Sequence, residues 1–222
     1  MEPLSIHTVI RSRRKTIALI ISPDATLTVR APLRVSLTYI EQLVHKKQRW
    51  IRRKIKEIAA RPKISPHEFL DGEAFFYLGK TYPLKIVEND TLSIGDYFYF
   101  PRSMISDPLM NFNAWYKKQA MQIIPERVAW YARQIGVEYR SIRISNARRQ
   151  WGCCSHARDL KFSWRLVMAP MHVIDYVVVH ELSHVQELNH GPRFWQKVKL
   201  CYPGYEQAKQ WLKGNAQQLS SL

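Results

Sequence analysis

Cysteine, glycine and acidic side chains are scarce in this sequence, and long apolar runs are missing from it. The 222 residues include three cysteines and eight glycines. Three cysteines cannot form an even-numbered disulfide framework, which excludes a small disulfide-stapled fold and suggests a reducing compartment. No apolar run approaches the ~18 residues of a membrane-spanning helix, and no apolar leader precedes a small-residue cleavage site. These absences predict a soluble, cytoplasmic protein without a membrane partner.

The shortage of acidic side chains leaves a large positive charge. Lys and Arg number 34 against 18 Asp and Glu, a formal charge of +16. Such a field favours nucleic acid, nucleotides or acidic peptides as partners, although charge alone can also serve solubility. The hydrophobic fraction of 46% is ordinary for a globular chain, so disorder is not expected.

Residues 1–104 are predicted to form a β-rich lobe. Alternating apolar residues and turn signals predict strands in five segments: residues 6–11, 16–21, 26–30, 69–87 and 91–100. The first three are expected to form an antiparallel meander. Gly72 and Gly79 are expected in turns, and neither belongs to a phosphate-binding loop.

One long helix in this lobe is predicted to carry the densest positive charge of the chain. It begins at Ser36 or Thr38, where Thr38 and Glu41 offer a capping box, and it ends before Pro62. One face is apolar, and the opposite face carries Lys46, Lys47, Arg49, Arg52, Arg53, Lys54 and Lys56. This stretch, Lys46 to Lys56, suits a nucleic-acid contact through phosphates, and it also suits an ordinary solvated helix face.

Residues 105–222 are predicted to form a second, catalytic lobe, which makes the chain α+β. Its first helix is expected to start at Asp107 and Pro108 and to end at Gly136. A small antiparallel sheet is expected from residues 140–145 and 160–164.

The clearest chemical signal is a His-Glu-x-x-His motif formed by His180, Glu181 and His184. On a helix, residues four apart lie ~40° apart on one face, so the two imidazoles can bind one ion. Glu181 is turned by ~100° from His180, which suits a general base beside the metal rather than a ligand. Surface helices also contain this motif by chance, but the apolar Val177-Val178-Val179 run leading into it is unlike a surface.

A catalytic zinc usually has three protein ligands and an open position, so a third donor is required. His190 is the candidate. In a continuous helix its ring would lie ~15 Å along the axis from His180, too far for a shared ion. The helix is therefore expected to stop after about Leu188, helped by Asn189, which tolerates a left-handed conformation, and by Gly191-Pro192.

The connection between the two strands of the second lobe contains candidate substrate contacts. A strand edge beside the motif helix could pair with an extended peptide, and Gly152 would allow a close backbone approach; an internal hairpin is the alternative. Arg149, Trp151, Gly152 and Tyr205 are the candidate substrate-binding residues. The oxyanion of acyl transfer needs a donor besides the metal, and Arg149, Tyr202 and Tyr205 are candidates for this role.

Several segments of the chain also occur together in a known family. In order, they are Trp151-Gly152-Cys153-Cys154-Ser155, Trp164-Arg165-Leu166, Ala169-Pro170, Tyr176 to His184, Asn189-His190 and Phe194-Trp195. They resemble the YgjP-like metallopeptidase-domain family, related to the WLM and SprT-like zinc proteases, and the resemblance extends over nearly all of the chain. It implies a zincin-like second half, Zn²⁺ bound by His180, His184 and His190, and Glu181 as the catalytic residue.

Two positions depart from the pattern of that family. Cys153 stands where serine is usual, and Ser163 stands where asparagine is usual before the tryptophan. Neither is an expected metal ligand, so both bear on substrate contacts along the hairpin and not on the metal.

Three functions are carried forward. The first is a zinc-dependent hydrolase, above all a metallopeptidase that acts on a peptide or protein. The resemblance also implies a nucleoside-triphosphate pyrophosphatase activity at the same site, which the positive charge would suit. The third is a nucleic-acid-binding protein with structural zinc, although structural zinc is normally held by four protein ligands.

Overall fold

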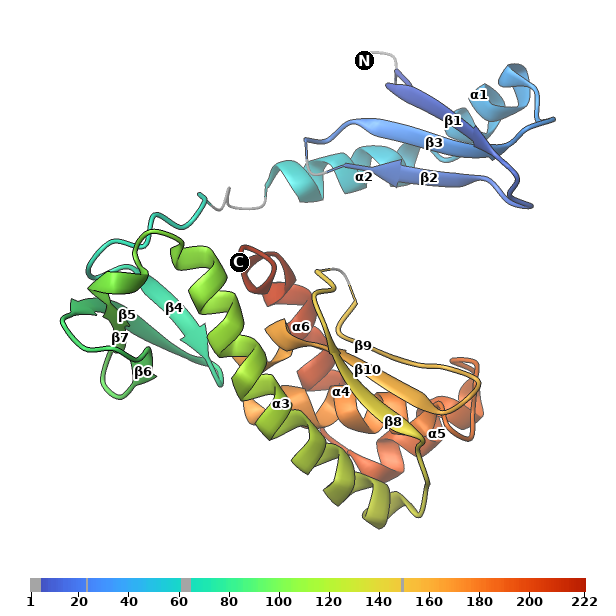
Figure 1. Ribbon diagram of the computed structural model, residues 1–222. Coiled ribbons are helices and arrows are strands. Elements are labelled where there is room, and N and C mark those ends of the chain that lie inside the picture. The colour runs from blue at the N-terminus through green and yellow to red at the C-terminus, as the bar shows by residue number, and fades with distance from the viewer. Residues whose placement is uncertain (1–4, 23, 61–64, 149) are drawn as a thin grey trace. The chain divides into compact units, whose positions relative to one another are not determined.

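The structure, a computed structural model, describes residues 5–22, 24–60, 65–148 and 150–222 (Figure 1). The chain divides into two compact units, Met1–Lys63 and Ile64–Leu222. The division predicted between residues 104 and 105 falls inside the second unit, because the strands before it share one aromatic core with the helix after it. Both units combine helices with small sheets, so the α+β class is confirmed.

The first unit contains a three-stranded sheet. Its strands are β1 (Thr8–Ser12), β2 (Ala18–Ile21) and β3 (Leu27–Pro32), in the order β1-β3-β2. β3 is antiparallel to β2 and parallel to β1, so the predicted antiparallel meander is wrong. Because β1 and β2 run in opposite directions, a strand that enters between them has to be parallel to one of them.

Two helices pack on this sheet, α1 (Leu37–Lys46) and α2 (Gln48–Ala59). The single long helix predicted here is wrong, because Lys47 (φ −98°, ψ 8°) ends α1 and starts α2. The break contains neither glycine nor proline, and apolar residues keep helical spacing across it, so periodicity could not reveal it. The buried core of the unit joins β3 to both helices through Leu27, Val29, Ala31, Ile40, Val44 and Ile51.

The second unit begins with a four-stranded sheet of β4 (Ala74–Tyr77), β5 (Lys80–Val87), β6 (Ser93–Ile94) and β7 (Phe98–Pro101), in the order β4-β5-β7-β6. The β4–β5 turn holds Leu78 and Gly79 in the left-handed region, and their N–H groups donate to the carbonyls of Val167 and Met168 at 2.9 and 3.0 Å. A Cβ at position 79 would lie 2.4 Å from Cγ of Pro170. Glycine thus lets this turn pack against the residue that precedes the motif helix.

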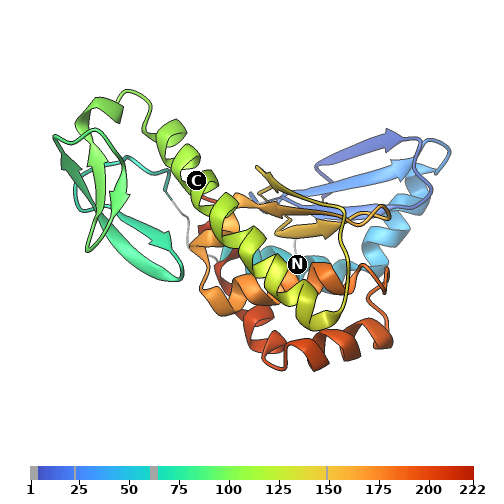
Figure 2. The ribbon, with the colours of Figure 1, turned by 60° about the horizontal axis from the view of Figure 1, so that its bottom comes forward.

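A short 3₁₀ turn, η1 (Arg102–Met104), leads to the long helix α3 (Pro108–Ile135). The predicted ends of this helix are confirmed: the side chain of Asp107 accepts from the N–H of Met110 at 3.1 Å, and Gly136 is left-handed with φ 70°. α3 starts beside the four-stranded sheet and runs to the second sheet of the unit (Figures 1 and 2). The rings packed around its first turns include Phe75, Phe98, Phe100, Phe112, Tyr116 and Trp164.

The second sheet is formed by β8 (Ser141–Ser145), β9 (Gly152–Cys154) and β10 (Asp159–Ser163), in the order β8-β10-β9. β10 is parallel to β8 and antiparallel to β9, so the sheet is mixed and not antiparallel as predicted. After β8 the chain passes to the far edge of the sheet to form β9, and β10 then fills the position between these two strands. β9 is left as an edge strand.

Four elements complete the second unit: η2 (Trp164–Met168), α4 (Met171–Ser183), α5 (Pro192–Cys201) and α6 (Tyr205–Leu219). α4 contains His180 and Glu181 of the motif, and His184 is its C-cap. The helix contacts α3, α5, α6 and β9, and residues 173–179 are all buried. Arg127 of α3 donates to both carboxylate oxygens of Asp175 at 2.6 and 2.9 Å, which fixes α4 against α3. Among the described residues, no helix has the length and apolar character needed to cross a bilayer.

Candidate metal centre

Three imidazoles converge at the C-terminal end of α4. Nε2 of His190 lies 2.9 Å from Nε2 of His180 and 3.1 Å from Nε2 of His184. The ligand nitrogens of the three rings lie within 4.8 Å of one another. Tetrahedral ligands ~2.1 Å from one zinc ion would be about 3.4 Å apart, so a small outward rotation of the rings would suit such an ion. The three histidines therefore form a group that could hold a metal ion.

His190 reaches the other two rings because α4 ends early. The helix ends at Ser183, whereas the sequence suggested that it continues to about Leu188. The hydroxyl of Ser183 donates to the carbonyl of Val179 at 2.7 Å, a side-chain bond of the kind that weakens and bends helices. Asn189 does not adopt the left-handed conformation expected of it. The chain therefore turns back toward His180 because α4 ends at Ser183, and not because of a left-handed residue at position 189.

Hydrogen bonding and burial favour neutral rings with free Nε2 atoms. Nδ1 of His184 lies 2.9 Å from the carbonyl of Glu187; because a carbonyl only accepts, Nδ1 carries a proton, so in the neutral ring it is Nε2 that has the lone pair. Nδ1 of His180 is buried and has no hydrogen-bond partner among the described residues. Burial, followed by the charges of neighbouring groups, lowers the pKa of His180 to about 3. Neutral imidazole is the form that binds metals.

The aromatic start of α5 surrounds the three rings. Phe194 is fully buried, and its ring centroid lies 4.5, 4.7 and 4.9 Å from those of His184, His190 and His180. Trp195 lies 5.8 Å from both His180 and His190. These ring contacts fix the imidazoles from the side of α5. Phe194 and Trp195 therefore contribute to the site by packing against its histidines.

Glu181 is the buried acid of the site, with 5% of its surface exposed. Burial raises the pKa of its carboxyl to about 8. Gly152 of β9 lies directly against it: a Cβ on this glycine would be 2.6 Å from Cγ and 2.7 Å from Oε1 of Glu181. The edge strand can approach the carboxyl this closely only because position 152 lacks a side chain.

The two cysteines after Gly152 are also close to the carboxyl. Burial first, and the charge of Glu181 second, raise the pKa of the Cys153 thiol, and the same causes raise that of Cys154 to about 11. Both thiols are therefore protonated at neutral pH, which makes them poor nucleophiles and poor metal ligands.

Of the other predicted substrate contacts, Trp151 directly precedes Gly152, and its carbonyl accepts from the N–H of Ser163 at 2.9 Å. Tyr205 stacks on Trp195 with centroids 5.5 Å apart, so it belongs to the aromatic wall beside the histidines. Arg149 lies outside the described residues.

Tyr202 is not near the three rings. Its hydroxyl donates to the carbonyl of His172 at 2.8 Å, near the start of α4. Eight residues of helix separate His172 from His180, or ~12 Å along the axis. This contact corrects the expectation that Tyr202 could donate to an oxyanion at the site.

Lys209 of α6 is a neighbour of the site that sequence reasoning missed. Its Nζ lies 4.2 Å from the ring centroid of Trp195. Its charge is one cause, after burial, of the lowered pKa values of His180 and His190. The sequence signal that could have identified Lys209 is its spacing from Tyr205, a predicted site residue. Lys209 follows Tyr205 by four residues, so the two share a face of α6.

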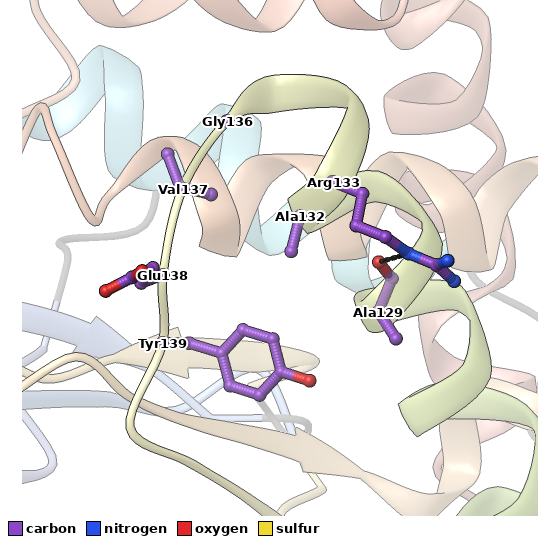
Figure 3. A pocket seen from close by; sticks show the side chains of 7 residues that line it. All are labelled: Ala129, Ala132, Arg133, Gly136, Val137, Glu138 and Tyr139. Atoms are coloured by element: carbon purple, nitrogen blue, oxygen red, sulfur yellow. Dashed lines mark hydrogen bonds between the residues drawn. The ribbon is translucent and has the colours of Figure 1, made fainter.

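A pocket of about 730 Å³ lies elsewhere in the second unit, at the end of α3 (Figure 3). It is lined by Ala129, Ala132, Arg133, Gly136, Val137, Glu138 and Tyr139. Nε of Arg133 donates to the carbonyl of Ala129 at 3.2 Å, so this side chain lies along its own helix. None of the three histidines, nor Glu181, lines the pocket, which is therefore separate from the candidate metal centre.

Comparison with known proteins adds a family and one solved structure. A family model described as "YgjP-like, metallopeptidase domain" matches residues 15–215. No curated protein matches the chain. The crystal structure of the metallopeptidase zymogen of Pyrococcus abyssi abylysin is similar over 44% of this chain and 95% of that one, with 19% identity and a TM-score of 0.39.

Proposed function

The chain belongs to the YgjP-like metallopeptidase-domain family, and from this premise we propose that it is a zinc-dependent hydrolase that cleaves peptide bonds. The observation that carries the proposal is the convergence of three imidazole nitrogens at the end of α4, a helix that also presents a buried carboxyl. In this proposal His180, His184 and His190 hold Zn²⁺, and Glu181 is the catalytic residue.

The donor set fits zinc. Three protein ligands with one open position are usual for catalytic zinc, and imidazole nitrogen is one of its common ligands. The bond from Nδ1 of His184 to a backbone carbonyl is the arrangement that commonly orients a metal-binding ring. When bound, Zn²⁺ supplies Lewis acidity and lowers the pKa of a coordinated water to about 7.

Glu181 would move the proton of the reaction. Its carboxylate would take a proton from the attacking water and return it to the leaving amine. Burial favours the protonated carboxyl, whereas a cation held by the neighbouring imidazoles would favour the carboxylate. These opposing influences would keep the pKa of Glu181 near the working pH, where proton transfer is most effective.

The edge of β9 supports a peptide as substrate. An extended peptide could add to this strand through backbone hydrogen bonds. Because Gly152 belongs to the same strand and lies against Glu181, the added peptide would pass the carboxyl. In this arrangement Trp151 and Tyr205 would contact substrate side chains, and the predicted contact of Arg149 stays a prediction.

A second candidate reaction at the same site is the hydrolysis of nucleoside triphosphates. The observation that favours it is the position of Lys209 beside the histidines, where it could receive a phosphate. Phosphate chemistry is more often carried out at carboxylate-rich magnesium sites, whereas this group consists of three histidines. Peptide hydrolysis is therefore the stronger proposal.

The third candidate, a nucleic-acid-binding protein with structural zinc, fits the site less well. Structural zinc is normally closed by four protein ligands, and the described residues bring together three. The nucleic-acid contact predicted for residues 46–56 concerns the first unit and does not involve these histidines. We also propose a cytoplasmic setting, which would keep the free thiols of Cys153, Cys154 and Cys201 reduced.

Metal analysis combined with a substrate panel tests the proposal. The purified chain should contain zinc and should cleave an unfolded polypeptide in preference to the four common nucleoside triphosphates. Glu181→Gln should keep the zinc and lose hydrolysis by about 10²- to 10⁴-fold. Glu126→Gln, at an exposed position of α3, is the matched control and should behave as the parent chain.

Zinc-loaded Glu181→Gln that still hydrolyses peptides at the parent rate would remove the assigned role of this residue. Hydrolysis of nucleoside triphosphates alone, lost in the same variant, would favour the second candidate. A chain that contains zinc but hydrolyses neither substrate class would favour the third candidate, a nucleic-acid-binding protein with structural zinc.

A further inference from the structure

Positive charge is concentrated in the first unit. Residues 1–63 contain 15 of the 34 Lys and Arg but only 4 of the 18 Asp and Glu, a formal charge of +11 out of +16. Residues 64–222 carry the other +5. The charge is thus a property of the unit that does not contain the three histidines, and the hydrolase proposal leaves it unexplained.

Within this unit, α2 separates an apolar face from a cationic face. Ile51 is fully buried, and Ile55 packs against the same core. Arg49, Arg53 and Lys56 recur at intervals of four and three residues on the opposite side, and all three are exposed. These three cations, together with Trp50, are named the α2 cationic face.

Acidic side chains neutralise little of this face. Glu57, the sole acid within α2, contacts Arg53 at 3.7 Å and Lys54 at 2.5 Å. Arg49 and Lys56 have no acidic partner within 4.0 Å in the part of the chain that the structure describes. Two unneutralised cations about two helical turns apart, with Arg53 between them, attract a ligand that carries several negative charges.

Trp50 indicates the nature of that ligand. Its side chain is 36% exposed, although tryptophan is usually well buried. It lies within one helical turn of Arg53 and directly follows Arg49 in α2, so an aromatic side chain stands next to two of the cations. Aromatic side chains in cationic grooves stack on the bases of single-stranded nucleic acids, whereas the bases of a duplex are already stacked.

We propose that the α2 cationic face binds single-stranded nucleic acid, with the cations on successive phosphates and Trp50 stacked on a base. An anionic membrane surface is a poorer match. Amphipathic helices bind membranes by inserting their apolar face, and the apolar face of α2 is already packed into the core of the first unit. The inference does not depend on the hydrolase function, because the face and the three histidines belong to different units.

The test is the anisotropy of a short fluorescent single-stranded oligonucleotide, titrated with the full chain over a series of salt concentrations. The triple variant R49E/R53E/K56E should bind at least tenfold more weakly at low salt. The slope of log affinity against log salt should shrink by about 2, since each phosphate contact contributes ~0.7. Glu181→Gln should bind as the parent chain does.

A matched control separates a binding face from net charge. K118E/K199E/K213E makes the same charge change at three exposed lysines of the second unit. It should weaken binding by less than threefold. Equal losses in the two triple variants would show that affinity follows total charge, and they would overturn the proposal.

The stacking role of Trp50 needs its own comparison. Trp50→Ala should weaken binding by roughly fivefold or more, and Trp50→Phe should retain most of the affinity because it keeps an aromatic face. A duplex of the same sequence should bind more weakly than the single strand. Equal binding of the duplex, or stronger binding to phosphatidylserine vesicles or to polyglutamate, would overturn the assignment.

Discussion

The two units differ in how they use their charged side chains. In the second unit, a few charged side chains are largely buried and hold specific partners: Arg127 donates to Asp175, and Arg165, 3% exposed, donates to the carbonyls of Asn146 and Leu222. In the first unit, most cations of α2 lie at the surface, where Glu57 is the sole acid of the helix. Buried pairs position neighbouring atoms, whereas exposed cations act over a distance on whatever approaches.

The comparison also separates two kinds of electrostatic effect. Removal of Glu181 from water raises the pKa of its carboxyl to about 8, so burial at this one position changes the protonation of a single group. An exposed pair such as Arg53 and Glu57 contributes ~0–1 kcal/mol and is screened by salt. Activity should therefore respond to single atoms in the second unit, and ligand attraction should respond to groups of charges in the first.

The change that most strongly tests the second unit is His190→Ala. It removes the donor that lies beyond the end of α4 and its cap, and we expect metal affinity to fall by more than ~100-fold, with hydrolysis lost in parallel. Metal content and peptide hydrolysis measure the effect, and His156→Ala, at an exposed position, is the control. Oligonucleotide binding should not change. Full metal binding by His190→Ala would show that this ring is not a ligand.

Gly152→Ala tests how closely β9 must approach the acid. The new Cβ would meet Cγ of Glu181 at 2.6 Å, so the carboxyl or the strand has to move. We expect kcat for peptide hydrolysis to fall ~10²-fold while zinc content is unchanged, because ångström-scale displacement of a catalytic group costs about this much. Gly214→Ala, where a Cβ meets no atom within 4 Å, is the matched control. An unchanged kcat would show that the close approach is not needed.

Ile51→Ala tests whether the units respond separately. Ile51 is the fully buried residue on the inner face of α2. Its truncation should lower the free energy of unfolding of the first unit by ~2–5 kcal/mol. Hydrogen exchange should accelerate in α1 and α2, while exchange in α4 and peptide hydrolysis stay at parent values. Equal acceleration in α4 would mean that the two units unfold as one.

Lys209→Glu should have the smallest effect, because this cation lies at the rim of the site. We expect kcat/KM for a peptide with acidic residues, relative to its neutral counterpart, to fall by about two- to fivefold, as for an exposed charge pair. Lys209→Met, which keeps the aliphatic packing on Trp195, should show part of this loss. A ratio that does not change in Lys209→Glu would exclude a role for this charge in specificity.

Local rules predicted the elements whose ends are encoded in neighbouring residues. The cap of Asp107 and the left-handed Gly136 bound α3 as the sequence indicated. The break at Lys47 and the position of β3 between β1 and β2 were missed, because both depend on packing between segments and leave apolar periodicity intact. Lys209 was missed for a similar reason, since only the tertiary contact of its side chain with Trp195 of α5 brings it beside the histidines.

The sequence by itself determined the donor types and their spacing: two imidazoles one helical turn apart, a carboxyl between them, and a third imidazole that required a chain reversal. These follow from helix geometry, which depends on residues a few positions apart. Only the tertiary structure decided that α4 ends at Ser183, that Phe194 packs against all three rings, and that β9 reaches the carboxyl through Gly152. Each of these depends on contacts between segments distant in the chain or on competing local hydrogen bonds, which no residue pattern specifies alone.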